Sequence, residues 1–355
     1  MDFLGLVLKY PVGRMLTVQE RAHHLHQKQR LNLEPSYQLS VIKMNSTFLE
    51  SVDKWFAWKG MISAFALAVL AIFVGGVMFI SIAWMMEAFA STTASSESSF
   101  WILNSAGMAV VGGIVGSGAI WLLRKESFRF THYPIRFNRK SQTVHVFRPD
   151  GTVLSVPWEK IFFTLGHLAL WNEWEIRGYI LDPDEKILET FSLSYLGTLN
   201  AKDIAPEKKD YSSQDFVRAH WEFVRRYMED GPQGLSSQVQ FCMPVAGRRE
   251  SFRVGAERVF ANFSGIPSLI YWLVSPFCLI VSCFRWFAMR TSKVPEWPPD
   301  IEAGCVVEPN DPYAIEGAPD GERVAVFPSA ALVAGGRFCT SSEPATVVGK
   351  PTSEM

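Results

Sequence analysis

The sequence predicts a membrane protein of the α+β class. Two long uncharged stretches indicate membrane helices: residues 61–86 carry no charged side chain over 26 positions, and residues 100–123 carry none over 24. Segments at 143–158 and 173–195 alternate β-branched or aromatic residues with polar ones, a pattern typical of strands. We therefore expect a transmembrane helical hairpin, followed by an antiparallel sheet with one C-terminal helix, a third hydrophobic segment and an extended tail.

The two apolar stretches are long enough to be membrane helices. About 20 apolar residues cross the hydrocarbon core of a bilayer, and uncharged runs of this length are rare in the buried helices of soluble proteins. Trp84, Trp101 and Trp121 lie near the ends of the two stretches, where amphipathic rings favour the membrane interface. Transmembrane helices are therefore predicted at 61–86 and 100–123.

The basic residues predict the orientation of this hairpin. Residues 1–60 contain eight Lys and Arg and residues 124–140 contain six, whereas residues 87–99 contain none. Lys and Arg resist translocation, so the segments that carry them stay in the cytoplasm. We expect the 1–60 segment and the 124–247 region on the cytoplasmic side and the 87–99 loop on the outer side.

The glycines of "MAVVGGIVGSGAIWLLRK" (108–125) allow two interpretations. A phosphate-binding loop needs a preceding strand, exposed N–H groups at a helix start and a Lys-Ser/Thr ending, and none of these is present. Small residues in four-residue steps instead let helices approach closely in lipid. The predicted packing row contains Ser105, Ala109, Gly113 and Ser117, with Gly112 and Gly116 beside it. This row would pack either against the other helix of the hairpin or against a second copy of the protein in a homo-oligomer.

The 124–247 region is predicted to fold as a small curved sheet or half-barrel capped by a helix. Turns are expected at 148–151 (Arg-Pro-Asp-Gly) and at 182–184 (Asp-Pro-Asp), since Pro, Asp and Gly supply turn geometry. The helix is expected to begin at Ser212 or Ser213 and to stop before Gly231 and Pro232. Its apolar face contains Val217, His220, Trp221, Val224 and Met228.

The third hydrophobic segment, 263–284, is ambiguous. Basic residues lie on both sides of it, so a simple span would place one cluster on the outer side, and Pro276 favours a bend. An in-plane or re-entrant segment, a third span and a soluble core helix all remain open. The acidic, Pro-rich tail at 294–355 is expected to be largely disordered.

The sequence contains no recognisable catalytic set. It has no GxSxG, HExxH or CxxC motif, and His23 and His26 have no neighbouring carboxylate or cysteine that would complete a metal site. The net charge of −1 gives no reason to expect a nucleic-acid partner. We therefore expect no catalytic residues, no metal and no cofactor.

A basic cluster follows the second span. Its members are Arg124, Lys125, Arg129, Arg136, Arg139, Lys140 and Arg148. The cluster either reflects the orientation bias alone or forms a contact site for anionic lipid headgroups or an acidic peptide, because each basic residue near an anionic leaflet contributes about 1 kcal/mol.

Two sequence stretches resemble known families. "PIRFNRKSQTVHVFRPDGTVLSVPWEKI" resembles the opening strands of bacterial pleckstrin-homology-like (PH-like) domains, which implies such a domain on the cytoplasmic side. The whole layout, with "RWFAMRTSKVPEWPPDIEAGC" and "DPYA", is similar to an uncharacterised family of proteobacterial inner-membrane proteins often encoded among type VI secretion genes. This resemblance implies a bacterial inner membrane and a periplasmic 87–99 loop, and it supplies no catalytic residues.

These features support three hypotheses about function. The leading hypothesis is a non-enzymatic inner-membrane protein whose PH-like domain binds membrane lipids or an unidentified protein partner, as an adaptor in type VI secretion. The alternative is an immunity protein against a membrane-directed effector, although the 87–99 loop offers little outward surface. A transporter or lipid-modifying enzyme is disfavoured, because neither 61–86 nor 100–123 contains an ionisable residue.

Overall fold

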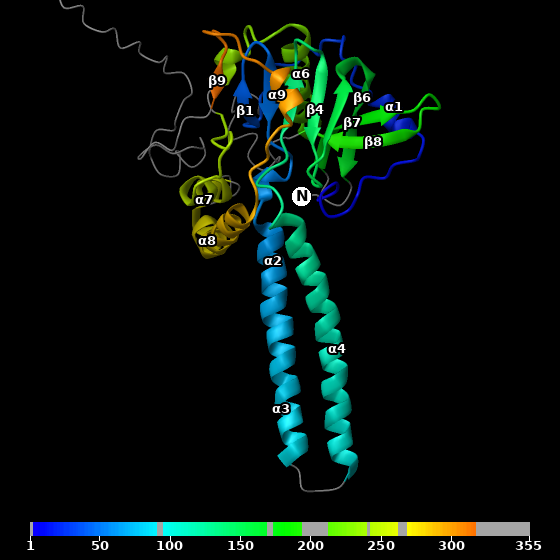
Figure 1. Cartoon of the computed structure of the whole chain (residues 1–355), viewed down its shortest axis with the longest axis vertical. Coiled ribbons are helices and arrows are strands. Elements are labelled where there is room, and N and C mark those ends of the chain that lie inside the picture. Colours follow the sequence, from blue (N-terminus) through cyan, green and yellow to red (C-terminus); the bar gives the residue numbers. More distant parts are fainter. Residues whose placement is uncertain are drawn as a thin grey trace, which may run out of the picture.

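The chain enters the two-helix hairpin from one strand of a sheet and returns from it into the neighbouring strand of the same sheet. The computed structural model describes residues 3–90, 95–168, 173–193, 212–239, 242–261 and 268–316. Figure 1 shows two long helices projecting from a body of strands and short helices, which we call the head. The α+β class is confirmed. Within these described residues, three helices are long and apolar enough to cross a membrane: Met61–Ala90, Ser99–Glu126 and Leu269–Thr291.

The larger sheet is an antiparallel meander with one added edge strand. Its spatial order is β5 (Val153–Pro157), β4 (Thr143–Phe147), β3 (Ile135–Asn138), β2 (Phe48–Ser51), β1 (Val41–Met44) and β9 (Ile315–Glu316). Ser51 pairs with Ile135 at the ends of β2 and β3 that connect to the hairpin.

The sheet that was predicted from the 124–247 region also contains strands from the 1–60 segment, because β1 and β2 are central strands of the larger sheet. All four residues of β2 are buried, including Glu50, which pairs with Arg136. A strand that is buried on both faces shows no alternation of polar and apolar residues, so the sequence pattern does not reveal it.

The smaller sheet contains β6 (Ile161–Leu168), β7 (Glu173–Leu181) and β8 (Ile187–Ser192) in that order. A short 3₁₀ helix, Trp158–Lys160, makes the corner between β5 and β6. Both predicted turns are confirmed: the Arg148 N–H donates to the Thr152 carbonyl at 2.9 Å, and the Asp182 N–H donates to the Lys186 carbonyl at 2.9 Å.

Helix α6 (Ser213–Glu229) packs against the core formed by the two sheets. Ser212 caps it in a reciprocal pair with Asp215, as predicted. The Trp221 ring stacks on the Trp158 ring with centroids 5.5 Å apart, and the Trp158 indole N–H donates to Glu229 at 2.8 Å. The predicted apolar face is therefore the face that fills the core.

The hairpin consists of α2 (Met61–Val69), a π-helical turn (Leu70–Gly75), α3 (Gly76–Ala90) and α4 (Ser95–Glu126). The predicted 87–99 loop is shorter than expected, since both helices continue past the apolar stretches, and residues 91–94 lie outside the described residues. Polar residues mark where the apolar stretch ends, which need not be where the helix ends.

The contact face of α4 contains only part of the predicted small-residue row. Ser105, Gly112, Gly116 and Ala119 are buried. A Cβ atom on Gly112 would lie 3.0 Å from Val77, and one on Gly116 would lie 3.0 Å from Val74.

Ala109, Gly113 and Ser117 are exposed, so their prediction as hairpin packing residues is wrong. Four-residue steps drift around a helix of 3.6 residues per turn, whereas the contact face of two nearly parallel helices recurs every 3.5 residues on average. The spacing of Ser105, Gly112 and Ala119 follows that period.

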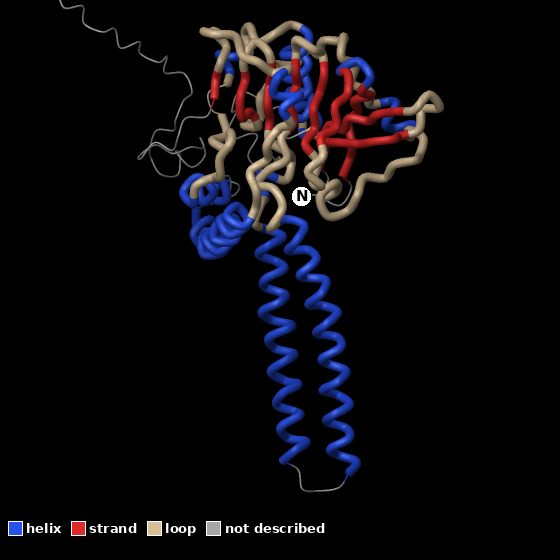
Figure 2. The backbone as a smooth tube through the Cα atoms, in the orientation of Figure 1, coloured by secondary structure: helices blue, strands red, loops and turns tan. Residues whose placement is uncertain are grey.

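Helix α7 (Phe252–Ala261) packs on α8 (Ser268–Thr291), and α9 (Pro299–Ala303) lies on the larger sheet. Helix α8 is seen almost end-on in Figures 1 and 2, in which the hairpin stands vertical, so its axis crosses the hairpin axis. The predicted disorder of 294–355 is wrong for 294–316, because Ile301 and Cys305 bury against Phe48. Two apolar residues are too few to make a pattern, and residues 317–355 lie outside the described residues.

Candidate functional site

A cleft of about 550 Å³ opens at the base of the head, beside the end of α4. Four parts of the chain line it: the N-terminal segment, the stretch between β2 and α2, the end of α4 with the stretch after it, and the ends of β4 and β8. We call it the basal cleft and define it by the polar residues that line it: Lys9, Tyr10, Asp53, Trp55, Lys125, Arg129, Tyr133, Arg148, Asp150, Glu189, Thr190 and Ser192.

The N-terminal segment is held against β8 and forms one wall of the cleft. The Tyr10 hydroxyl and the Ser192 hydroxyl are 2.7 Å apart, and the Gly13 N–H donates to the Ile187 carbonyl at 2.7 Å. Burial, and next the negative charge of Glu175, raise the pKa of Tyr10 to about 12. Tyr10 therefore stays protonated at neutral pH.

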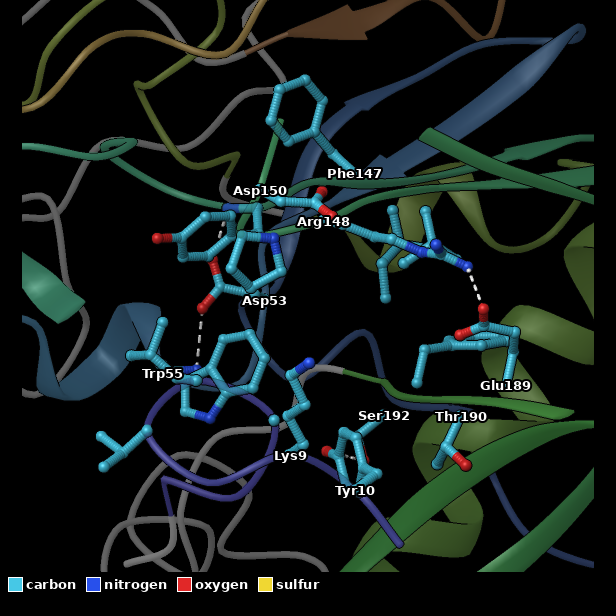
Figure 3. A pocket seen from close by; sticks show the side chains of 18 of the residues that line it. Lys9, Tyr10, Asp53, Trp55, Phe147, Arg148, Asp150, Glu189, Thr190 and Ser192 are labelled. Atoms are coloured by element: carbon cyan, nitrogen blue, oxygen red, sulfur yellow. Dashed lines mark hydrogen bonds and ion pairs between the residues drawn. The ribbon is translucent and has the colours of Figure 1, made fainter. Parts of the chain in front are cut away.

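The cleft contains cations that have no carboxylate partner. Among the described residues, Lys9, Lys125 and Arg129 form no ion pair. Arg129 donates from Nη1 to the Pro149 carbonyl at 2.9 Å, which fixes its side chain against the β4–β5 turn. Figure 3 shows Lys9 beside the Trp55 ring and the Arg148–Glu189 pair, 3.1 Å apart, on another side of the opening.

Asp53 anchors the floor of the cleft. Its carboxylate accepts hydrogen bonds from the Tyr133 N–H at 2.7 Å and from the Trp55 N–H at 2.9 Å. Burial raises the pKa of Asp53 above its usual range. The Trp55 indole N–H and the Tyr133 hydroxyl are buried and have no hydrogen-bond partner among the described residues. The floor of the cleft is therefore fixed by the backbone hydrogen bonds that Asp53 accepts.

The structure divides the predicted basic cluster. Lys125, Arg129 and Arg148 line the basal cleft, and the Arg124 carbonyl accepts a hydrogen bond from Arg129 Nε at 3.3 Å. The cluster is interrupted by β3, whose four residues carry the chain about 13 Å away from the hairpin.

The prediction of Arg136 as a lipid or partner contact is wrong. Arg136 is only 3% exposed and pairs with Glu50 at 2.7 Å and with Glu302 at 3.1 Å. Arg139 and Lys140 follow at the far end of β3: Arg139 donates to the Ser46 carbonyl at 3.1 Å, and Lys140 pairs with Glu308. These three residues lie outside the basal cleft.

Sequence reasoning missed Lys9 and Tyr10. They lie in an N-terminal segment that is irregular apart from the short helix α1 (Val18–Ala22), so no periodicity places them near β8 or near the membrane. The only usable signal was the isolated Lys9 beside an aromatic residue.

A second polar cluster joins the hairpin to the head. The Glu126 carboxylate accepts hydrogen bonds from the Gly60 N–H at 2.9 Å and from the Ser63 N–H at 2.7 Å. Lys59 donates to the Phe130 carbonyl at 2.6 Å, and burial lowers the pKa of Lys59 to about 8. The ends of the hairpin are thereby tied together at the point where they leave the sheet.

Arg285 ties α8 to the same place. It is fully buried and forms a two-bond pair with Glu250, with N–O distances of 2.7 and 3.0 Å. It also donates to the Phe56 carbonyl at 2.8 Å. Gly60 has a φ of +99°, and a Cβ atom there would lie 2.5 Å from the Arg285 backbone nitrogen. Only glycine fits at this crossing.

The basal cleft presents positively charged side chains at its surface. Lys9, Lys125 and Arg129 offer positive charge, which suits anionic oxygen atoms. The part of the chain that the structure describes contains no group of three or more His, Cys, Asp or Glu placed to hold a metal ion.

Residues 203–309 match the model of a protein family described as a family of unknown function, DUF6708. The matched stretch includes α6, α7, α8 and α9, so it covers the core helix of the head and the crosswise helix but not the hairpin. Comparison with curated proteins and with solved structures gives no match.

Proposed function

We propose that this protein is a non-enzymatic binding protein anchored in a bacterial inner membrane, and that its basal cleft binds the headgroup of an anionic phospholipid. In this proposal the head, with its PH-like pair of sheets, lies in the cytoplasm. The observation that carries the proposal is the convergence of Lys9, Lys125 and Arg129 on one cleft without carboxylate partners.

The position of the cleft supports a lipid ligand. Lys125 is one residue before the end of α4, and Arg129 is three residues after it, so both lie at headgroup level when α4 crosses the bilayer. A volume of about 550 Å³ falls within the range of about 300–1,000 Å³ that is common for small-ligand sites. Each basic side chain near an anionic surface contributes about 1 kcal/mol to attraction.

The basic residues around the hairpin support the cytoplasmic placement of the head. Residues 1–60 and 124–140 are rich in Lys and Arg, and both belong to the head. The roles of secretion adaptor and immunity protein stay predictions, because no contact among the described residues favours either one.

The proposal is tested by binding of short-chain phospholipids to the full-length protein in neutral detergent. Dihexanoyl phosphatidylglycerol should bind and dihexanoyl phosphatidylcholine should not. Replacing both Lys9→Gln and Arg129→Gln removes two charges and should weaken binding by about tenfold or more, since about 1.4 kcal/mol corresponds to a factor of ten. Inorganic phosphate is run alongside, to separate headgroup recognition from binding of any phosphate.

Lys160→Gln is the matched control, because Lys160 is exposed on the head and does not line the cleft. It should bind phosphatidylglycerol as the unaltered protein does. Equal binding of the two lipids, or unchanged binding by the double variant, would overturn the proposal.

A further inference from the structure

Helix α8 has two apolar faces that lie in different surroundings. Cys278 and Val281 pack against Val259 of α7, and Met61 of α2 packs on the same cluster. The opposite face is bare: Leu269 is 83% exposed, Trp272 is 73% exposed and Leu273 is 80% exposed. Leu279, Ile280 and Trp286 continue this exposed face toward the C-terminal end of the helix.

The exposed face carries no charge over most of its length. Residues 268–284 contain no Lys, Arg, Asp or Glu. A contiguous apolar surface of this kind on a head in water is rare in soluble proteins and marks contact with another apolar phase.

The level of α8 along the hairpin is fixed by Arg285. Arg285 donates to the Phe56 carbonyl at 2.8 Å and to the Lys59 carbonyl at 3.3 Å, so α8 lies beside the first turn of α2. This is the end of the hairpin that joins the head. The exposed face therefore starts where the apolar part of the hairpin starts.

Both neighbours of α8 belong to the head. Before it, Val254 and Ala261 of α7 pack in a core with Ile42 and Val52 of the larger sheet region. After it, the Lys293 N–H donates to the Arg129 carbonyl at 2.8 Å, and the Thr131 N–H donates to the Lys293 carbonyl at 2.8 Å. The chain thus starts and finishes α8 on one side of the hairpin base.

We propose that α8 is an in-plane membrane helix, whose exposed face rests in the lipid leaflet nearest the head and which does not cross the bilayer. Its 24 residues make it about 36 Å long, enough to span, but its axis crosses that of the hairpin (Figures 1 and 2). Interfacial helices bury one apolar face to a depth of about 5–10 Å and place Trp at that level. Trp272 and Trp286 fit this role.

This inference does not depend on the ligand of the basal cleft. It makes α8 a third point of attachment, beside the two helices of the hairpin, and it keeps residues 294–316 on the side of the head. A head that is held at three points cannot swing freely about the hairpin base.

The test measures the depth of α8 in vesicles of phosphatidylglycerol and phosphatidylcholine. Full-length protein with its native cysteines replaced carries one bimane-labelled cysteine at Leu273→Cys or Ile280→Cys. Lipids with a nitroxide near the headgroup or near the end of the acyl chain quench the label. An in-plane helix gives stronger quenching by the shallow nitroxide at both positions.

Two matched controls calibrate the depth. Phe79→Cys, on the exposed face of α3, should be quenched more by the deep nitroxide, and Lys160→Cys, exposed on the head and outside the basal cleft, should be quenched by neither. Stronger deep quenching at either α8 position would indicate a span, and no quenching at both would indicate a surface for a protein partner. Either result overturns the proposal.

A second measurement remains informative where a label disturbs α8. A membrane-impermeant maleimide is added to sealed vesicles that contain Glu296→Cys or Ser155→Cys, one after α8 and one on β5. The proposal expects both cysteines to react from the same side. Reaction from opposite sides overturns it.

Discussion

Glu126, the last residue of α4, caps the first turn of α2 by accepting a hydrogen bond from the Ser63 backbone N–H at 2.7 Å. The first N–H groups of a helix have no partner inside it, and a carboxylate there also interacts favourably with the helix dipole. The hydroxyl groups of Ser63 and Ser127 are 2.8 Å apart and add a second link. The hairpin is therefore closed at its base by side chains from both helices.

Replacing Glu126→Gln should loosen this closure. Glu126 accepts from the backbone N–H groups of both Gly60 and Ser63. The Gln amide can accept from only one of them and presents its own N–H donors to the other, so we expect a loss of about 1–2 kcal/mol of stability. The thermal unfolding midpoint of the purified protein in detergent measures it. Glu159→Gln, at an exposed position of the head, should leave the midpoint unchanged. An equal midpoint for the two variants would contradict the role of Glu126 as a cap.

The second prediction concerns the buried ion pair of Arg285 and Glu250. Arg285→Met leaves the buried Glu250 carboxylate without its guanidinium, and the loss of one partner of a buried pair costs about 3–5 kcal/mol. The double variant with Glu250→Gln removes the unpaired charge and should recover much of the loss. Thermal unfolding of the two single variants and the double variant gives the coupling energy. Purely additive effects would show that the pair does not hold α8 in place.

Neighbouring glycines of α4 allow a matched comparison within the hairpin. Gly112→Leu places a side chain against Val77, where a Cβ atom alone would lie 3.0 Å away, whereas a Cβ atom at Gly113 meets nothing within 4 Å. Gly112→Leu should therefore lower the unfolding midpoint, and Gly113→Leu should not. Disulfide formation between cysteines introduced at Ser81 and Ser105 reports hairpin closure independently, because Ser105 donates to the Ser81 carbonyl. Equal behaviour of the two glycine variants would contradict the contact face.

The two glycines also show what sequence can and cannot predict. Length and lack of charge were enough to predict the helices of the hairpin, because those properties follow from the bilayer itself. The contact face was predicted only in part: Gly112 and Gly116 were included, but the four-residue row was centred on Gly113. The direction of a packing face depends on the partner helix and its crossing angle, which one sequence segment does not contain.

The residues of the basal cleft could be predicted only in part, because strand pairing between distant segments brings them together. Lys125, Arg129 and Arg148 were candidates because they follow a membrane helix, but Arg136 was grouped with them although it is buried beside Glu50. Glu50 precedes the hairpin and Arg136 follows it, so only the pairing of β2 with β3 brings them together. Lys9 reaches the cleft through contacts of its neighbours with β8, a relationship that no local pattern carries.

The last prediction concerns the pH dependence of stability that the buried His132 side chain causes. It is 2% exposed, and burial, helped by the nearby positive charge of Lys59, lowers the pKa of His132 to about 3. The unfolded chain binds a proton at this residue near pH 6.5, whereas the folded protein does not. The unfolded state therefore gains protons as the pH falls from about 6.5 toward 3. The free energy of unfolding should fall across that window by up to about 1.4 kcal/mol per pH unit because of this group. Above pH 7 His132 should contribute no change in stability.

His132→Phe removes this titration and keeps a ring against Phe56, whose centroid is 6.2 Å away. Between pH 7 and pH 5 the thermal unfolding midpoint of the variant should fall less than that of the unaltered protein. His220, which burial also gives a pKa of about 4, still titrates in the variant, so the pH dependence should be reduced and not abolished. Parallel midpoint curves for the two proteins over this range would show that His132 has the same pKa in the folded and unfolded states, and would contradict its burial away from water.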